Sequence, residues 1–146
     1  MKTLLVRSML AVVCILGTAV AVADEHPYTE GPVVEVTFIR TKPGMFDAYM
    51  KWVATERKQE MEEYKKAGII LSYAVYTMPP RTPHDADLVL VVEYKNMAAL
   101  DNLDDRTEAI DKKIFGSMDQ ANKGTIDREK MREVIGMEYM RELKLK

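Results

Sequence analysis

The stretch Val36 to Trp52 (VTFIRTKPGMFDAYMKW) changes its apolar spacing across a single Pro43–Gly44 pair, and this change constrains the fold more than any other feature. Before the pair, β-branched and aromatic residues occupy alternate positions, as in a strand. After it, apolar residues recur three and four positions apart, as on one face of a helix. Proline suits the first position of a helix, because its missing N–H is not needed there. The stretch therefore predicts a strand followed by a long amphipathic helix that Gly68 ends.

The rest of the chain continues this alternation of strands and helices. We predict strands at 33–40, 69–78, 86–94 and 137–146. Asn96 caps a second helix, the segment 116–124 breaks it, and a short helix restarts at Thr125 and runs to about residue 136. The order β-α-β-β-α-β predicts an α+β fold of the ferredoxin-like type. Such a fold has one antiparallel four-stranded sheet with both helices on one face.

The chain begins with a pattern typical of a secretory signal peptide. Lys2 and Arg7 precede a short apolar run, and Ala21-Val22-Ala23 offers small residues for signal peptidase. The run is shorter than the ~20 residues of a membrane-spanning helix, so we favour cleavage after Ala23 over an uncleaved anchor. We expect a periplasmic or secreted protein that leaves the membrane after cleavage. The predicted organisation is a signal peptide at 1–23, a flexible tail at 24–32 and a single domain at 33–146.

Charge and cysteine content exclude several classes of function for the mature chain. The full sequence has 21 basic and 23 acidic residues, and loss of Lys2 and Arg7 lowers the net charge from −2 to −4. A mildly acidic domain with mixed signs is not typical of a nucleic-acid-binding protein. The single cysteine, Cys14, belongs to the signal peptide. We therefore expect no nucleic-acid partner, no thiol catalysis and no cysteine metal site.

Helices on one face of a sheet leave its other face uncovered. Alternate residues of a strand point to opposite faces of the sheet, and the assignment of each set to a face is called here the strand phase. On the phase that we assign, the open face carries Ile39, Ala74, Val89, Val91 and Met140. These apolar residues are too many to stay in contact with water on a small domain. We therefore expect two sheets to pack face to face in a homodimer.

Two local patterns resemble a known superfamily. The first is a strand followed by Thr41-Lys42-Pro43-Gly44 and a long helix, and the second is a strand pair ending in Glu93-Tyr94-Lys95-Asn96 before a second helix. Together they resemble the dimeric α/β-barrel superfamily, which includes antibiotic-biosynthesis monooxygenases and NIPSNAP-like proteins. The resemblance implies a homodimer with a small-molecule site inside the barrel. Haem-degrading members use a histidine on a helix, whereas His26 and His84 both lie outside the predicted helices.

On the same strand phase, five polar side chains point away from the helices and are candidates for a ligand site: Glu35, Thr37, Ser72, Tyr76 and Glu93. A carboxylate in a partly apolar space suits proton abstraction, and a tyrosine can donate to a developing oxyanion. The same groups would also suit strand ends in water or ion pairs across a dimer.

Three functions stay open on these residues. They are an exported binding protein for a small, partly apolar molecule, a cofactor-independent oxygenase or isomerase acting on a phenolic substrate, and a ligandless structural or stress-related dimer. Whether the protein is an enzyme is therefore left open. No catalytic residue follows from the sequence, because one fold hosts many activities.

One metal site is predicted at the new N-terminus. Cleavage after Ala23 would expose Asp24-Glu25-His26, in which the α-amino group, two backbone amides and the imidazole can surround one ion in a plane. Cu(II) and Ni(II) prefer this tetragonal nitrogen geometry. A flexible acidic tail is the competing interpretation, and cleavage after Ala21 would remove the site. We expect no other cofactor.

Overall fold

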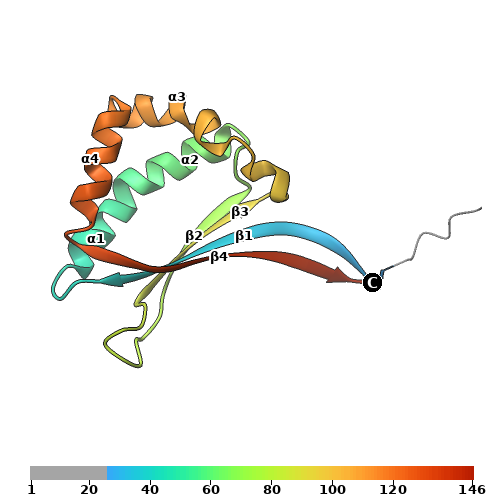
Figure 1. The fold of residues 1–146 in the computed structure, drawn as a ribbon, viewed down its shortest axis with the longest axis horizontal. Helices are drawn as coiled ribbons and strands as arrows, with labels where there is room; N and C mark the ends of the chain where they lie inside the picture. Colours follow the sequence, from blue (N-terminus) through green and yellow to red (C-terminus); the bar gives the residue numbers. More distant parts are fainter. Residues whose placement is uncertain (1–25) are drawn as a thin grey trace, which may run out of the picture.

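The computed structural model describes residues 26–146, so the predicted signal peptide and its cleavage site lie outside the described residues. Four strands form one antiparallel sheet in the order β2-β3-β1-β4 (Figure 1). They are β1 (Tyr28–Thr41), β2 (Ser72–Thr77), β3 (Leu88–Tyr94) and β4 (Arg132–Leu145). This order, in which β3 separates β1 from β2, is that of the split β-α-β arrangement. The predicted ferredoxin-like α+β fold is confirmed.

All the helices lie on one side of the sheet (Figure 1). The first helical run is continuous and consists of α1 (Phe46–Trp52), the π-helical turn η1 (Val53–Arg57) and α2 (Lys58–Lys66). A 3₁₀ turn η2 (Met97–Leu100), α3 (Leu103–Phe115) and α4 (Met118–Arg128) follow β3. Within residues 26–146, none of these helices has the length and apolar character needed to cross a membrane.

The first helical run begins and ends near the residues that the sequence indicates. Gly44 and Gly68 have φ angles of 76° and 69°, a left-handed conformation that glycine adopts without strain. Gly68 follows the last turn, as predicted for a glycine after a helix. The helix begins at Phe46 rather than at Pro43, because Pro43 and Gly44 form the turn that leads into it.

The segment after α3 differs from the prediction. Gly116, with φ 86°, ends α3, but residues 118–128 then form the continuous helix α4 instead of a break. Ser117 caps this helix by accepting a hydrogen bond from the backbone N–H of Gln120 at 3.2 Å. An isolated glycine costs a helix only about 1 kcal/mol, so Gly124 does not interrupt it. The predicted helix to residue 136 was also wrong, because β4 already begins at Arg132.

The paired strands β1 and β4 are longer than predicted. Residues 28–32, which we expected in a flexible tail, belong to β1, and Tyr28, Thr29 and Glu30 pair with the end of β4, where Tyr28 lies opposite Leu145. Beyond the helical layer these two strands continue as a ribbon that reaches the C-terminus (Figure 1). The ribbon is irregular between Glu30 and Val33, where the register shifts by one residue.

The core lies between the sheet and the helices. Alternate residues of β1 and β3 share this face, because paired residues of neighbouring strands point to the same side. One cluster joins strand residues to α2 and the following loop, and comprises Val33, Val92, Tyr94, Met61, Tyr64, Ile69 and Ile70. A second cluster joins them to α1 and η1, and comprises Ile39, Leu88, Leu90, Tyr49 and Val53. Ile39, which we placed on the open face, is therefore a core residue.

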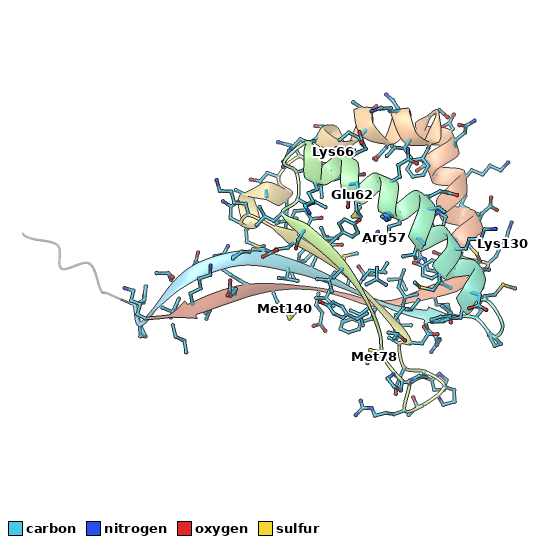
Figure 2. The ribbon with its side chains drawn as sticks, turned by 180° about the vertical axis from the view of Figure 1, so that it is seen from behind. Arg57, Glu62, Lys66, Met78, Lys130 and Met140 are labelled. Atoms are coloured by element: carbon cyan, nitrogen blue, oxygen red, sulfur yellow. The ribbon has the colours of Figure 1, made fainter. Side chains whose placement is uncertain are left out.

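The opposite face of the sheet carries an apolar surface that no helix covers. We call it the open face and define it by Val34, Val36, Phe38, Ala74, Val89, Val91 and Met140. Figure 2 shows Met140 on the side of β4 away from the helices. The prediction placed Ala74, Val89, Val91 and Met140 on this face as well. For β1 it exchanged the two faces, so that Val34, Val36 and Phe38 were expected to point toward the helices.

Candidate functional site

A cavity of about 230 Å³ lies between the sheet and the helices. Its walls come from β1, β3, β4, the first helical run and the end of α4. The lining residues are Glu35, Thr37, Ile39, Tyr49, Trp52, Arg57, Glu60, Leu90, Arg128, Arg132, Val134 and Met137. Val134 and Met137 are 46% and 53% exposed, so these two residues form its rim. The cavity therefore combines an apolar rim with an interior that contains three arginines and two glutamates.

Glu35 on β1 receives hydrogen bonds from both neighbouring strands. The hydroxyl groups of Tyr94 on β3 and Tyr139 on β4 each donate to Glu35 Oε2 at 3.2 Å. Burial and the Glu35 charge raise the pKa of the Tyr94 hydroxyl, and the same two causes raise the pKa of Tyr139. Both phenols therefore stay protonated and act as donors at neutral pH. Within the described chain, the other carboxylate oxygen of Glu35 accepts no hydrogen bond.

Glu60 on α2 is the second carboxyl group of the cavity. The Tyr64 hydroxyl lies 3.2 Å from Glu60 Oε1 and closer to Asp111 Oδ1 on α3, at 2.5 Å. Burial raises the pKa of Glu60, and the nearby Arg57 only partly opposes this effect. A tyrosine has one hydroxyl proton, and the shorter distance assigns it to Asp111. The bond from Tyr64 to Glu60 is therefore weak and opposes the effect of burial only slightly.

Two arginines at the start of β4 and the end of α4 lie against aromatic rings. The Arg128 guanidinium is 4.4 Å from the centre of the Trp52 ring, and the Arg132 guanidinium is 5.7 Å from that of Tyr49. Cations are attracted to such ring faces. The two rings are themselves stacked, with centroids 5.6 Å apart. This stack positions both guanidinium groups beside the cavity.

Several donor atoms of these two arginines are buried without a hydrogen-bond partner in the described chain. They are Arg128 Nε, Arg132 Nε and Arg132 Nη1. Arg132 is only 8% exposed. Glu129 Oε1 lies 3.6 Å from Arg132 Nη1, which is an ion-pair distance but too long for a hydrogen bond. Burial lowers the pKa of Arg128, and the neighbouring charge of Arg132 lowers it further.

The π-helical turn contributes directly to the cavity wall. The backbone N–H of Lys58 bonds to the carbonyl oxygen of Val53, five residues back, which widens the helix at this turn. Trp52 directly precedes this turn and Arg57 ends it, and both line the cavity. Figure 2 shows Arg57 on the side of the helical run that faces the sheet. Single π-turns inside α-helices occur often at functional sites.

The five predicted site residues divide between the two faces of the sheet. Glu35 and Thr37 line the cavity on the helix side, so their predicted orientation away from the helices was wrong. Ser72, Tyr76 and Glu93 lie on the other side, where the Ser72 hydroxyl donates to Glu93 Oε2 at 2.6 Å. β1 carries apolar residues on both faces, and alternation alone therefore does not determine its phase.

Sequence reasoning missed the charged residues that the helices contribute. The charged runs at 56–60 and 127–130 favour solvated helix faces when the sequence is considered alone, because they mix signs at helical spacing. In the structure, however, Arg57, Glu60 and Arg128 line the cavity. One signal could have found two of them. Arg57 and Glu60 lie four and seven residues after Val53 and thus fall on the apolar stripe of the helix. A charged residue within such a stripe points toward the interior.

A second hollow, of about 320 Å³, lies between the start of the first helical run and the loop after β2. Its carboxylates already have partners. Asp85 accepts from the backbone N–H groups of Arg81 and Thr82 at 2.9 Å, and Asp87 accepts from that of Thr41 at 3.0 Å. The Asp85 bonds hold the loop in its own conformation, and the Asp87 bond connects the end of the loop to β1. His84, in the same loop, is exposed to solvent.

The predicted N-terminal metal site falls mostly outside the described residues. Asp24 and Glu25 are not described, and His26 is exposed, with its ring stacked on Tyr28 at a centroid distance of 5.4 Å. Among residues 26–146, no group of three or more histidine, cysteine, aspartate or glutamate side chains is arranged to hold a metal ion.

The sheet order, the helical layer and the interior cavity define the class of the protein as a ferredoxin-like α+β fold. The structure is similar to the crystal structure of HapK from Hahella chejuensis, with a TM-score of 0.52. The match has 14% sequence identity and covers 75% of this chain and 91% of HapK. No protein-family profile matches the sequence, and no curated protein matches it. At this identity the likeness concerns the fold alone.

Proposed function

We propose that the protein binds a small, partly apolar molecule in the cavity between the sheet and the helices. The observation that carries this proposal is the combination of a 230 Å³ space, lined partly by apolar side chains, with charged groups that are largely withdrawn from solvent. A dry cavity of about 150 Å³ accommodates benzene, so this one has room for a single ring with a substituent. The binding site is thus placed on the helix side of the sheet and not on the open face.

Export and a homodimer belong to the same proposal. The N-terminal pattern favours a signal peptide, and thus a periplasmic or secreted protein without a membrane anchor. The centre of the open face is an apolar surface across two paired strands, with Val89 and Val91 on β3 beside Val34, Val36 and Phe38 on β1. We propose a second copy of the chain as its partner. A twofold axis midway between the two sheets and parallel to them would place these apolar surfaces against each other, at the usual sheet spacing of about 10 Å.

A second candidate is a cofactor-independent oxygenase or isomerase acting on a phenolic substrate. Glu35, whose Oε1 is without a donor in the described chain, is the favoured base for proton abstraction. The raised pKa of Glu60 suits it to return a proton. A ligandless dimer, the third alternative, is disfavoured because it would leave buried arginine donors permanently without partners.

Fluorescence of Trp52 tests the binding proposal, because this residue is the single tryptophan of the chain and lines the cavity. Titration with phenol and hydroquinone should change its emission in a saturable manner. The rim variant Val134→Phe should weaken binding by tenfold or more, whereas Ile135→Phe, at an adjacent exposed position outside the lining, should not. Equal loss in both variants, or no saturable change in the wild type, would contradict the proposal. Turnover of hydroquinone that Glu35→Gln abolishes would favour the enzyme.

A further inference from the structure

We infer that the molecule bound in this cavity carries a carboxylate, and that Arg132 and Arg128 bind it. This inference rests on the proposed function and specifies the chemical class of the ligand. It follows from the buried donors, from the charge balance of the lining residues and from the shape of the space.

Arg132 provides the main argument. Its side chain is nine-tenths buried, lines the cavity and has two nitrogen donors without a hydrogen-bond partner in the described chain. Glu129 Oε1, 3.6 Å from Nη1, forms an ion pair with Arg132 but accepts no hydrogen bond from it. Leaving the two donors unsatisfied is costly, because burial removes the water that would otherwise accept their hydrogen bonds. The nearby Tyr49 ring attracts the charge but is at most a weak acceptor. Arg132 Nε and Nη1 therefore need acceptor oxygens that lie in the plane of the guanidinium group.

Arg128 adds a second donor next to the first. Its Nη2 donates to the Thr125 hydroxyl at 2.8 Å, while its Nε is buried without a partner. Arg128 ends α4 and Arg132 begins β4, so the short turn between them brings both guanidinium groups to the same cavity. Two cations this close repel each other unless an anion lies between or beside them. A carboxylate has two coplanar oxygens that match arginine donors in a paired geometry.

The charge balance favours a single negative charge on the ligand. Three arginines and two glutamates line the cavity. Glu35 already receives two tyrosine hydroxyl groups on one oxygen, and burial favours the neutral form of Glu60. Neither glutamate forms a hydrogen bond or ion pair with Arg128 or Arg132 among the described residues. The positive charge of the three arginines therefore exceeds the negative charge of the two glutamates in the lining.

The remaining walls favour a flat apolar body. Ile39, Leu90, Val134 and Met137, all from the sheet, contribute the aliphatic part of the lining. A cavity of 230 Å³ accommodates one aromatic ring and a carboxylate, and the Glu35 side is suited to a hydroxyl substituent. We therefore choose benzoate as the probe, and its neutral amide, benzamide, as the matched control.

Isothermal titration calorimetry of the full chain tests the inference. Benzoate should bind tenfold to a hundredfold more tightly than benzamide, as expected from hydrogen bonds to charged groups worth about 1.5–3 kcal/mol. Arg132→Met should abolish this preference and, without ligand, should unfold at the same temperature as the wild type or higher, because an unpaired buried charge is removed. Arg141→Met is the matched control. Arg141 lies on the same strand outside the cavity and pairs with Glu30, so the preference should persist in this variant.

The possible outcomes separate the two proposals. Equal affinity for benzoate and benzamide, or a preference for benzoate that Arg132→Met does not change, overturns the carboxylate inference and leaves the binding proposal intact. The same conclusion follows if hydroquinone changes Trp52 emission but benzoate does not bind. If inorganic phosphate binds as tightly as benzoate and Arg132→Met weakens both equally, the site recognises oxyanions in general, and the assignment to a carboxylate is wrong. If no probe binds, both proposals fail. Should Arg132→Met not fold, Arg128→Met replaces it with the same expected loss of preference.

Discussion

Glu60 lies in a protein environment that disfavours its charge. Burial raises its pKa above the ordinary value of 4.5, so the folded protein binds this proton more tightly than the unfolded chain does. Folding stability should therefore fall as the pH rises through the range above 4.5. Glu60→Gln, which stays neutral, should raise the melting temperature at pH 7 by a few degrees and have little effect at pH 4. Thermal unfolding of the ligand-free protein at both pH values measures this difference.

Glu62→Gln is the matched control for this residue. Glu62 lies on the same helix and also accepts a hydrogen bond from a tyrosine hydroxyl, that of Tyr73, at 2.7 Å. Its substitution should leave the pH dependence of the melting temperature unchanged. If Glu60→Gln instead lowers the melting temperature at pH 7, attraction to Arg57 outweighs the cost of burial. Glu60 would then be ionised in the folded protein, and both glutamates of the cavity would carry a negative charge.

At the scale of elements, two glycines play opposite roles in the helical layer. Gly68 ends the first helical run with φ 69°, and no atom lies within 4 Å of the place where a Cβ would be. Gly68→Ala should therefore destabilise through backbone strain alone, by about 1 kcal/mol. Gly124 lies inside α4, where its contact, Arg128 Nη1 at 3.4 Å, is the end of a flexible side chain. Gly124→Ala should stabilise by about 0.5–1 kcal/mol.

Urea unfolding of the two variants measures both effects. The two variants control for each other, because both substitutions add the same methyl group but at backbone conformations of opposite hand. Destabilisation by Gly124→Ala would mean that α4 is not helical at this position in solution. In that case the predicted break at 116–124 would be right after all.

At the scale of the whole molecule, the proposed dimer depends on the open face. Val91 lies at its centre, between Val36 on β1 and Ala74 on β2. Val91→Lys should convert the dimer to monomers or aggregates, because a buried unpaired charge costs several kcal/mol. Sedimentation velocity measures the change. Ile126→Lys, at a position on α4 that is 67% exposed on the helical side, should leave the sedimentation coefficient unchanged. A dimer that persists in Val91→Lys would locate the interface elsewhere.

Much of the fold follows from short stretches of the chain. The change of spacing at Pro43–Gly44, the glycine after the first helix and the Asn96 cap are local signals, and the element order they predict is the observed one. Asn96, however, caps the 3₁₀ turn η2 and not the helix α3, which begins at Leu103. Each signal depends on backbone conformation or hydrogen bonds within a few residues, which a sequence contains in full. The predicted bounds of the helices were less accurate where the residues are compatible with both a helix and a loop, as around Gly124.

The candidate site depended on tertiary structure. Val33 and Ile39 on one face of β1 compete with Val34, Val36 and Phe38 on the other, so the strand phase is set only when helices pack against the sheet. Arg57, Arg128 and Arg132 come from a π-turn, a helix end and a strand start, and they meet only in the folded chain. The sequence by itself determined the order of the elements, because local interactions decide it. The cavity and its unpaired charges were decided by packing between segments far apart in the sequence, which no local pattern encodes.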